Sequence, residues 1–227
     1  MNDNTFSKVL SDVFTVDNME YLARGLGGTL AISIITVFAS IFLGTIFAIC
    51  RNYSGKVPRS ISSVYIEIFR NTPLLLWILI CIFMLPFGTP FWRGTLALIL
   101  YTSSVIAEIM RGGLNSIPKG QFEAARSQGF NFVQSLVFII LPQCFRRVVP
   151  SLMSQIITTI KDTSFLATFA IAEFFYNAKN LMGTLPQRVT VTSAHIFVIY
   201  IFIALVYFII NFMLSCIVRR LGRKTTH

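Results

Sequence analysis

Charged residues occur inside segments that are otherwise apolar enough to cross a membrane. Arg70 lies in the apolar segment 60–85, and the neighbours Lys161 and Asp162 lie in the segment 148–172. A charge near the centre of a bilayer costs about 2.5–3.5 kcal/mol on insertion scales, so such residues are usually paired or functional. A guanidinium can bind a carboxylate, and a carboxylate can bind an ammonium group. Opposed charges at one depth therefore predict a site for a zwitterion.

The segment around Arg70 also contains a predicted break in its helix. Arg70 lies about ten residues into its segment and Asp162 about thirteen, which places both about 15 Å deep at 1.5 Å per residue. Pro73 lacks the N–H that would bond the carbonyl of Phe69, so polar backbone groups are freed beside Arg70. In this hypothesis Asp162 binds a substrate ammonium and Arg70 a carboxylate. The predicted substrate-binding residues are Glu67, Arg70, Asn71, Thr72, Lys161, Asp162 and Ser164.

The same charges also have a purely structural interpretation. Arg70 could neutralise Asp162, or it could pair with Glu67 across one helical turn. Lys161 could pair with its neighbour or with a second subunit. For a single residue, pairing explains the charge about as well as substrate contact does. For the group as a whole, a polar pathway is the better explanation.

Other residues that could do chemistry have no expected role in a site. Glu108 lies near the inner end of its apolar segment, so we expect it to be solvated. His195, near the outer end of the last segment, is expected at the interface without a ligand role. The cysteines lack zinc-ligand spacing, and we expect them to behave as small apolar residues without a metal.

The composition defines an integral membrane protein in contact with the lipid bilayer. Of the 227 residues, 55% are apolar and only 12% are charged, about half the charged fraction of a soluble domain. The net charge of +10 could suit nucleic acid. However, the basic residues cluster beside apolar segments, so the membrane accounts for them and no nucleic acid is expected.

The sequence predicts an all-α fold with five membrane crossings, since about 20 apolar residues cross a bilayer. The expected crossings are residues 25–50, 60–85, 91–110, 148–172, and from 189 or 193 to 218. The apolar run 131–141 is too short to cross, so we expect it along the interface, ending or kinking at Pro142. Residues 173–188 are expected to form a loop or a short surface helix.

Lysine and arginine residues favour the cytoplasmic side of a membrane protein. They are concentrated in 51–59, in 111–147 and after 218. We therefore expect an extracytoplasmic N-terminal segment (1–24), a transmembrane domain (25–218) with a cytoplasmic loop (112–147), and a cytoplasmic basic tail (219–227).

The cytoplasmic loop has the sequence pattern of two short helices. Pro118 suits a first helical position, where its missing N–H costs nothing. Gly129 fits the left-handed position that ends a helix, and Asn131 can cap the next one. Ala124 and Ala125 are small enough for another protein to approach the first helix closely.

This loop resembles the EAA loop of ABC importer membrane subunits. That pattern is EAA, three residues, G, nine residues and I-x-L-P, and the sequence matches it at every fixed position: Glu123, Ala124, Ala125, Gly129, Ile139, Leu141 and Pro142. The segment FRNTPLL (69–75) is similar to the FRGTPLL pattern of polar amino-acid importer subunits. KDTSFL (161–166) resembles their K-(D/N)-(T/S)-S-L element. Asn71 and Phe165 depart from the commonest pattern, and asparagine is familiar among glutamate- and glutamine-type members.

The resemblance implies a type I ABC importer permease of the histidine, glutamine and glutamate family, in a bacterial plasma (inner) membrane. Glu123, Ala124, Ala125 and Gly129 would dock on an ATPase. The chain has no phosphate-binding loop, so partner ATPases would bind ATP and Mg. The implied partners are two ATPase subunits, a second permease chain, identical or paralogous, and an extracytoplasmic solute-binding protein.

Two other classes of protein fit the sequence less well. An ATP-independent secondary carrier or small channel could use Glu67, Glu108 or Asp162 for ion coupling, but it would leave the cytoplasmic loop unexplained. A membrane enzyme is disfavoured, because the sequence has only two histidines and no visible nucleophile–base pair.

Overall fold

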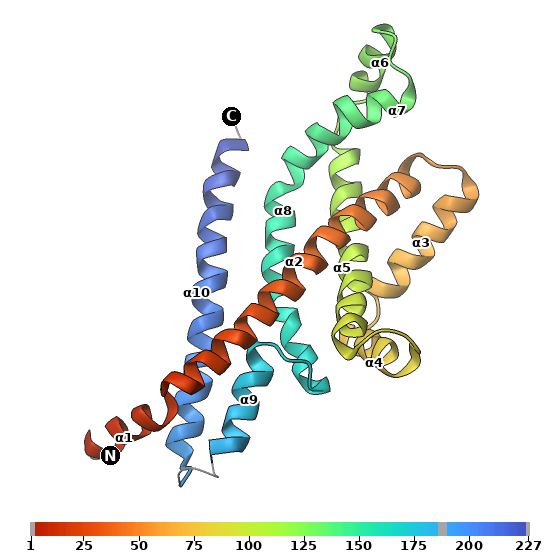
Figure 1. The fold of residues 1–227 in the computed structure, drawn as a ribbon. Coiled ribbons are helices and arrows are strands. Elements are labelled where there is room, and N and C mark those ends of the chain that lie inside the picture. The colour runs from red at the N-terminus through yellow and green to blue at the C-terminus, as the bar shows by residue number, and fades with distance from the viewer. Residues whose placement is uncertain (1–2, 186–189, 226–227) are drawn as a thin grey trace.

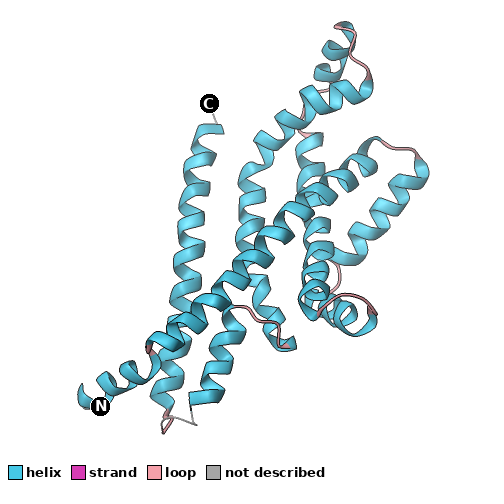
Figure 2. Cartoon of the chain, viewed as in Figure 1, coloured by secondary structure: helices cyan, strands magenta, loops and turns pink. Residues whose placement is uncertain are grey.

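The computed structural model describes residues 3–185 and 190–225, and every regular element in these ranges is a helix (Figure 2). The short helices α6 (Gly120–Ser127) and α7 (Phe132–Gln134) project from one end of the molecule (Figure 1). Helix α1 (Asp3–Val13) lies at the opposite end. The alternative start of the last crossing at residue 189 lies outside the described ranges.

Long apolar helices form the body of the molecule. Four runs are long and apolar enough to cross a membrane: α2 (Val16–Tyr53), α5 (Pro90–Asn115), Phe132–Phe169, which includes α8 (Leu141–Asp162), and Ser193–Val218 of α10 (Ser193–Thr225). A further pair, α3 (Lys56–Arg70) and α4 (Leu74–Met84), meets at an angle of 104°. When this bent pair is counted as one crossing, the total is five, as predicted.

Helix α2 packs on α5 along a row of small side chains. Ser40, Gly44 and Ala48 recur every four residues, which places them on one face of α2. A Cβ added at Gly44 would lie 2.8 Å from the carbonyl oxygen of Ser103 and 3.0 Å from the backbone nitrogen of Ala107. Small residues let membrane helices approach closely, and packing then replaces the hydrophobic drive that lipid does not supply. The pair α2–α5 is therefore the centre of the fold.

Other helices attach to this centre. Helices α3, α4 and α8 all contact α5. At the contact with α8, side chains of α8 pack directly on the backbone of α5, because a Cβ added at Gly113 would lie 2.8 Å from the Sγ atom of Cys144. Cys144 is fully buried there, in agreement with its predicted role as a small apolar residue.

The helix does not end at Pro142, so the first of the two predicted outcomes, an end or a kink, is wrong. The turns over Ser135–Ile140 widen into a π-helix, in which the N–H of Leu141 bonds the carbonyl of Leu136, five residues earlier. A proline ring clashes with the carbonyl four residues before it, which here belongs to Phe138 inside the widened turns. The chain therefore continues as one helical run to Phe169, and the short run 131–141 is part of a crossing.

The segment after this crossing forms a short helix, which is one of the two predicted alternatives, but one face of this helix is buried. Helix α9 (Phe174–Thr184) contacts α2 and buries Phe174, Ala178 and Leu181. The predicted basic tail is helical as far as Thr225, because α10 continues through it to that residue.

A buried carboxylate connects α9 to two long helices. Glu173 is fully buried and accepts hydrogen bonds from the hydroxyls of Thr29 on α2 and Tyr207 on α10, each at 3.2 Å. It also caps α9 by accepting the N–H groups of Phe175 and Tyr176. Burial raises the pKa of the Glu173 carboxyl, and these four hydrogen bonds oppose the rise.

His195 fixes α1 to α10, a structural contact that the sequence did not predict. Its side chain is buried, and its Nε2 atom lies 3.4 Å from an Asp12 carboxylate oxygen. The N–H of Thr192 donates to the Nδ1 atom at 3.2 Å. Because Nδ1 accepts this bond, the proton of the neutral ring is on Nε2, directed at Asp12.

Replacing Gly44 with alanine should destabilise the protein by about 1–3 kcal/mol, because the new methyl group would press on the backbone of α5. Thermal unfolding of the purified protein in detergent measures this. Gly27→Ala is the matched control on the same helix, since nothing lies within 4 Å of an added Cβ there. That control should be neutral or stabilising by up to about 1 kcal/mol. Equal unfolding midpoints for the two variants would contradict the packing argument.

Candidate functional site

A break at Pro73 separates helix α3 from helix α4, as the sequence predicts. The Asn71 amide donates to the backbone carbonyl of Glu67 at 2.8 Å, and the Thr72 hydroxyl donates to that of Ile68 at 2.7 Å. Carbonyls at a helix end in a membrane need such partners. Two of the residues predicted to bind substrate thus donate hydrogen bonds to backbone carbonyls at the end of α3.

Aromatic side chains hold this break in a fixed geometry. The rings of Phe69 and Trp77, one on each side of the break, stack with centroids 4.0 Å apart. The Trp77 indole N–H donates to the Thr72 hydroxyl at 2.6 Å. Tyr65 donates to the carbonyl of Leu100 on α5 at 2.7 Å. The bend is therefore fastened to itself and to α5.

An ion cluster lies beside the break, and Glu108 of α5 is its centre. Glu108 is bound by Arg51 of α2 and by Arg111, whose Nη2 atom is 2.9 Å from one carboxylate oxygen. Arg51 also reaches Glu67 of α3 at 3.0 Å. The expectation that Glu108 is simply solvated is wrong, because its side chain is only 16% exposed. The spacing Glu108–Arg111 could have signalled one pair, but the partners from α2 and α3 have no signal in the sequence.

Arg70 is the least committed member of this cluster. Its Nη1 atom lies 3.7 Å from a Glu108 oxygen, and its side chain is 40% exposed. Within the described residues its guanidinium makes no hydrogen bond and no other ion pair. The predicted alternative, a pair between Arg70 and Glu67 one turn away, is not formed, because Glu67 binds Arg51 and Asn71 instead.

The other predicted substrate-binding residues lie on a different helix. Lys161, Asp162 and Ser164 are placed where α8 passes into the 3-10 helix Thr163–Phe169 (η2). The Ser164 hydroxyl donates to the carbonyl of Lys161 at 2.7 Å. No ion pair joins Asp162 to Arg70 in the described structure, and α3 and α8 lie on opposite sides of α5 (Figure 1).

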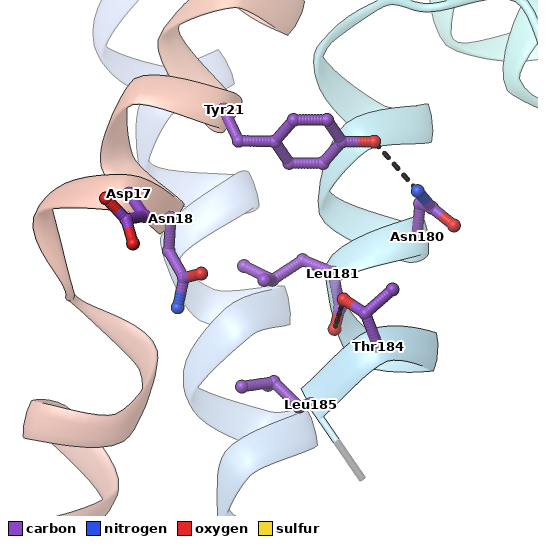
Figure 3. A pocket seen from close by; sticks show the side chains of 7 residues that line it. All are labelled: Asp17, Asn18, Tyr21, Asn180, Leu181, Thr184 and Leu185. Atoms are coloured by element: carbon purple, nitrogen blue, oxygen red, sulfur yellow. Dashed lines mark hydrogen bonds between the residues drawn. The ribbon is translucent and has the colours of Figure 1, made fainter. Parts of the chain in front are cut away.

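A polar cavity of about 370 Å³ opens at the end of the molecule that carries α1. Figure 3 shows its wall between α2 and α9, where Asn180 donates to the Tyr21 hydroxyl at 2.8 Å. Its lining residues are Asp17, Asn18, Tyr21, Asn180, Leu181, Thr184 and Leu185. No motif in the sequence distinguishes these positions.

At the other end, α6 and α7 form the loop that the family resemblance predicts to couple to an ATPase, here called the coupling loop, and this loop has the predicted caps. Gly129 follows α6 with a φ of +83°, which is the left-handed conformation expected of it. The N–H of Phe130 bonds the carbonyl of Ala125 at 3.1 Å, and that of Gly129 bonds Arg126 at 2.9 Å. Asn131 caps α7 in a reciprocal pair of bonds with Gln134.

The two alanines of the loop face different ways. Glu123 and Ala124 are exposed, and the Glu123 carboxylate has no partner within the described chain. Ala125 is only 2% exposed, so it packs against its own chain. Ala124 is therefore accessible to another protein, as the prediction requires, whereas Ala125 is not.

Aromatic contacts attach the coupling loop to the end of α2. The Tyr53 ring meets Phe122 of α6 at 5.6 Å and Phe132 of α7 at 5.7 Å between centroids. Phe122 and Phe132 are stacked at 5.8 Å. The side chains of Gln121 and Gln143 add a hydrogen bond of 2.9 Å between α6 and α8.

A helical membrane chain with a bent crossing, a charged cluster beside the bend and a projecting two-helix loop has the features of a transport permease. The comparison with protein families makes this specific. The chain belongs to the family of binding-protein-dependent transport system inner membrane components, whose model matches residues 40–227.

Individual relatives match along nearly the whole chain. It is 36% identical over 217 residues to the probable glutamine ABC transporter permease protein GlnP of Bacillus subtilis (strain 168), covering 94% of this chain and 97% of that protein. It is also 36% identical over 216 residues to the probable glutamine ABC transporter permease protein GlnM of the same organism, covering 92% and 94%. The crystal structure of an amino acid ABC transporter with histidines superposes with a TM-score of 0.78 at 28% identity, covering 92% of this chain and 96% of that one.

Gly129→Ala should loosen the coupling loop, because a left-handed conformation costs an alanine about 1 kcal/mol or more. A cost of 1 kcal/mol corresponds to about fivefold more of the open loop, and trypsin cleavage at the exposed Arg126 should accelerate by a similar factor. Gly120→Ala is the matched control within α6, where an added Cβ meets nothing within 4 Å. Equal cleavage rates in the two variants would show that the left-handed residue does not hold the loop.

Proposed function

We propose that this chain is the permease subunit of an ATP-driven importer that moves a polar amino acid, with glutamine favoured, into the cell. The observation that carries the proposal is the match over nearly the whole chain to permeases named for glutamine. The bound-histidine relative among solved structures supports an amino acid as the class of cargo. The exposed α6 favours coupling to an ATPase over the alternative of an ATP-independent carrier, which leaves this helix without a use.

In this proposal the chain functions as one subunit of a larger transport complex. Two ATPase subunits bind ATP and Mg and receive α6, while an extracytoplasmic solute-binding protein delivers the amino acid. A second permease chain completes the pathway. Two glutamine permeases from one organism are similar to this chain, so a paralogous partner is as compatible with the comparisons as a second copy. The N-terminus lies outside the bacterial plasma (inner) membrane and the C-terminus in the cytoplasm, because the basic loops favour this orientation.

Alternating access links the two ends of the molecule. Closure of the ATPase dimer moves α6, and the crossings then open the polar pathway first outward and then inward. Arg70 binds the substrate carboxylate, since it is the exposed and least committed guanidinium beside the bend. Asp162 of α8 lies across α5 from Arg70, so it attracts the substrate ammonium at another point of the pathway. Asn71, Thr72 and Ser164 stay next to the pathway, although in this state their side chains serve the backbone.

Glu123→Gln should lower substrate uptake at least about tenfold while the complex still hydrolyses ATP, because a charge-assisted contact worth about 1.5–3 kcal/mol would be lost at the ATPase surface. Uptake and ATPase activity are measured on the same proteoliposomes. Glu20→Gln is the control, since Glu20 is also an exposed helical carboxylate but lies near the opposite end of the molecule. Normal uptake by the Glu123 variant would remove this residue from the docking surface.

Arg70→Gln should weaken the binding of L-glutamine to the assembled permease complex about tenfold or more, since the substrate carboxylate loses a charged partner. Equilibrium binding of radiolabelled glutamine in nanodiscs, without the solute-binding protein, measures this directly. Arg24→Gln is the matched control, because Arg24 forms only an exposed pair with Glu20. Unchanged glutamine affinity in the Arg70 variant would contradict the carboxylate site.

A further inference from the structure

The three arginines around Glu108 are bound unequally. Arg111 donates to both carboxylate oxygens, at 2.9–3.0 Å, and Arg51 donates a hydrogen bond to one of them. Arg70 approaches to 3.7 Å without a hydrogen bond. Glu108 is therefore satisfied by two of its partners, and the third is held by charge alone.

The charge balance of the cluster also points to Arg70. The cluster contains three guanidinium groups and the carboxylates of Glu67 and Glu108. One positive charge is in excess among these groups. Arg70 is the most exposed of the three arginines, so the excess is most accessible to an incoming anion there.

We propose that Glu108 is a resident competitor for Arg70, which it holds when the site is empty and yields to the substrate carboxylate. This inference rests on the proposed function, because it requires that Arg70 binds substrate. Glu108 would then set the affinity for amino acids without touching them, as a positioning residue for Arg70.

The exchange requires little rearrangement. When Arg70 turns to the substrate, Glu108 keeps Arg51 and Arg111, so no buried carboxylate is left unpaired. A substrate carboxylate can take two parallel hydrogen bonds from the guanidinium, which Glu108 does not do. On the inward side the return of Arg70 to Glu108 favours release of the substrate. A permease needs such a release step, because its site must bind the substrate on one side of the membrane and release it on the other.

A double-mutant cycle tests the inference. L-glutamine binding to the permease complex in nanodiscs is measured for the wild type, Glu108→Gln, Arg70→Gln and the double variant. Removing the competitor should tighten glutamine binding about threefold to tenfold, the range expected for a partly exposed ion pair. In the Arg70→Gln background the same substitution should change the affinity by less than about twofold.

Two controls separate this effect from a general change of charge. The α-amide of glutamine lacks the carboxylate, so its affinity should not rise in Glu108→Gln. Glu67→Gln removes an equal charge from the same cluster but does not free Arg70, so its gain in glutamine affinity must be smaller. Should Glu108→Gln fail to insert or assemble, Glu108→Asp keeps the charge near Arg51 and Arg111 while withdrawing from the longest contact, and it should show a smaller gain.

The outcomes distinguish the inference from the proposed function. Glutamine binding no tighter in Glu108→Gln than in the wild type overturns the competitor role, as does an equal gain in the Arg70→Gln background. In either case, weaker glutamine binding in the single variant Arg70→Gln would still support Arg70 as the site for the substrate carboxylate. If Arg70→Gln binds glutamine as well as the wild type, the carboxylate site itself fails, and the competitor role fails with it.

Discussion

The close contact between α2 and α5 is the constraint on which the rest of the structure depends. Lipid does not drive apolar helices together, so this pair relies on the small residues Ser40, Gly44 and Ala48. Once the two backbones touch, their register is fixed. That register brings Arg51, three residues beyond Ala48, to Glu108, one residue beyond Ala107, and so places the charged cluster. Helices α3, α4 and α8 then all pack on α5.

A second requirement is that charged groups and freed backbone carbonyls at membrane depth need partners, and several of these partners are side chains that the sequence predicted to bind substrate. Asn71 and Thr72 cap the broken α3, and Glu67 neutralises Arg51. At the other end of α2, Glu173 accepts four hydrogen bonds within the protein. After these assignments Arg70 stands out, because its donors are not used by the chain that the structure describes.

Local patterns were predictable from the sequence, and contacts between distant segments were not. The helix break at Pro73, the left-handed Gly129 and the cap at Asn131 follow from the backbone chemistry of single residues, and the structure has all three. The helix through Pro142 was missed, because a π-turn that accommodates a proline leaves no composition signal. Glu108, Glu173 and His195 were missed for another reason. Their partners lie on helices far along the chain, and only tertiary packing brings them together. The predicted pairing of Arg70 with Asp162 had the same weakness.

The last turn of α2 connects the two regions to which we propose a function, the coupling loop and the ion cluster around Glu108. Tyr53 contacts both short helices of the coupling loop, and Arg51, two residues earlier, contacts Glu108. Since both residues belong to one helical turn, a displacement of that turn must change the aromatic contact and the ion pair together. Glu108 also faces Arg70. The last turn of α2 therefore contacts both the coupling loop and Glu108, the ion-pair partner of Arg70. A two-state equilibrium at this turn would therefore be biased by a protein bound to α6 and by an anion bound to Arg70, which is the physical requirement for coupling two separate sites.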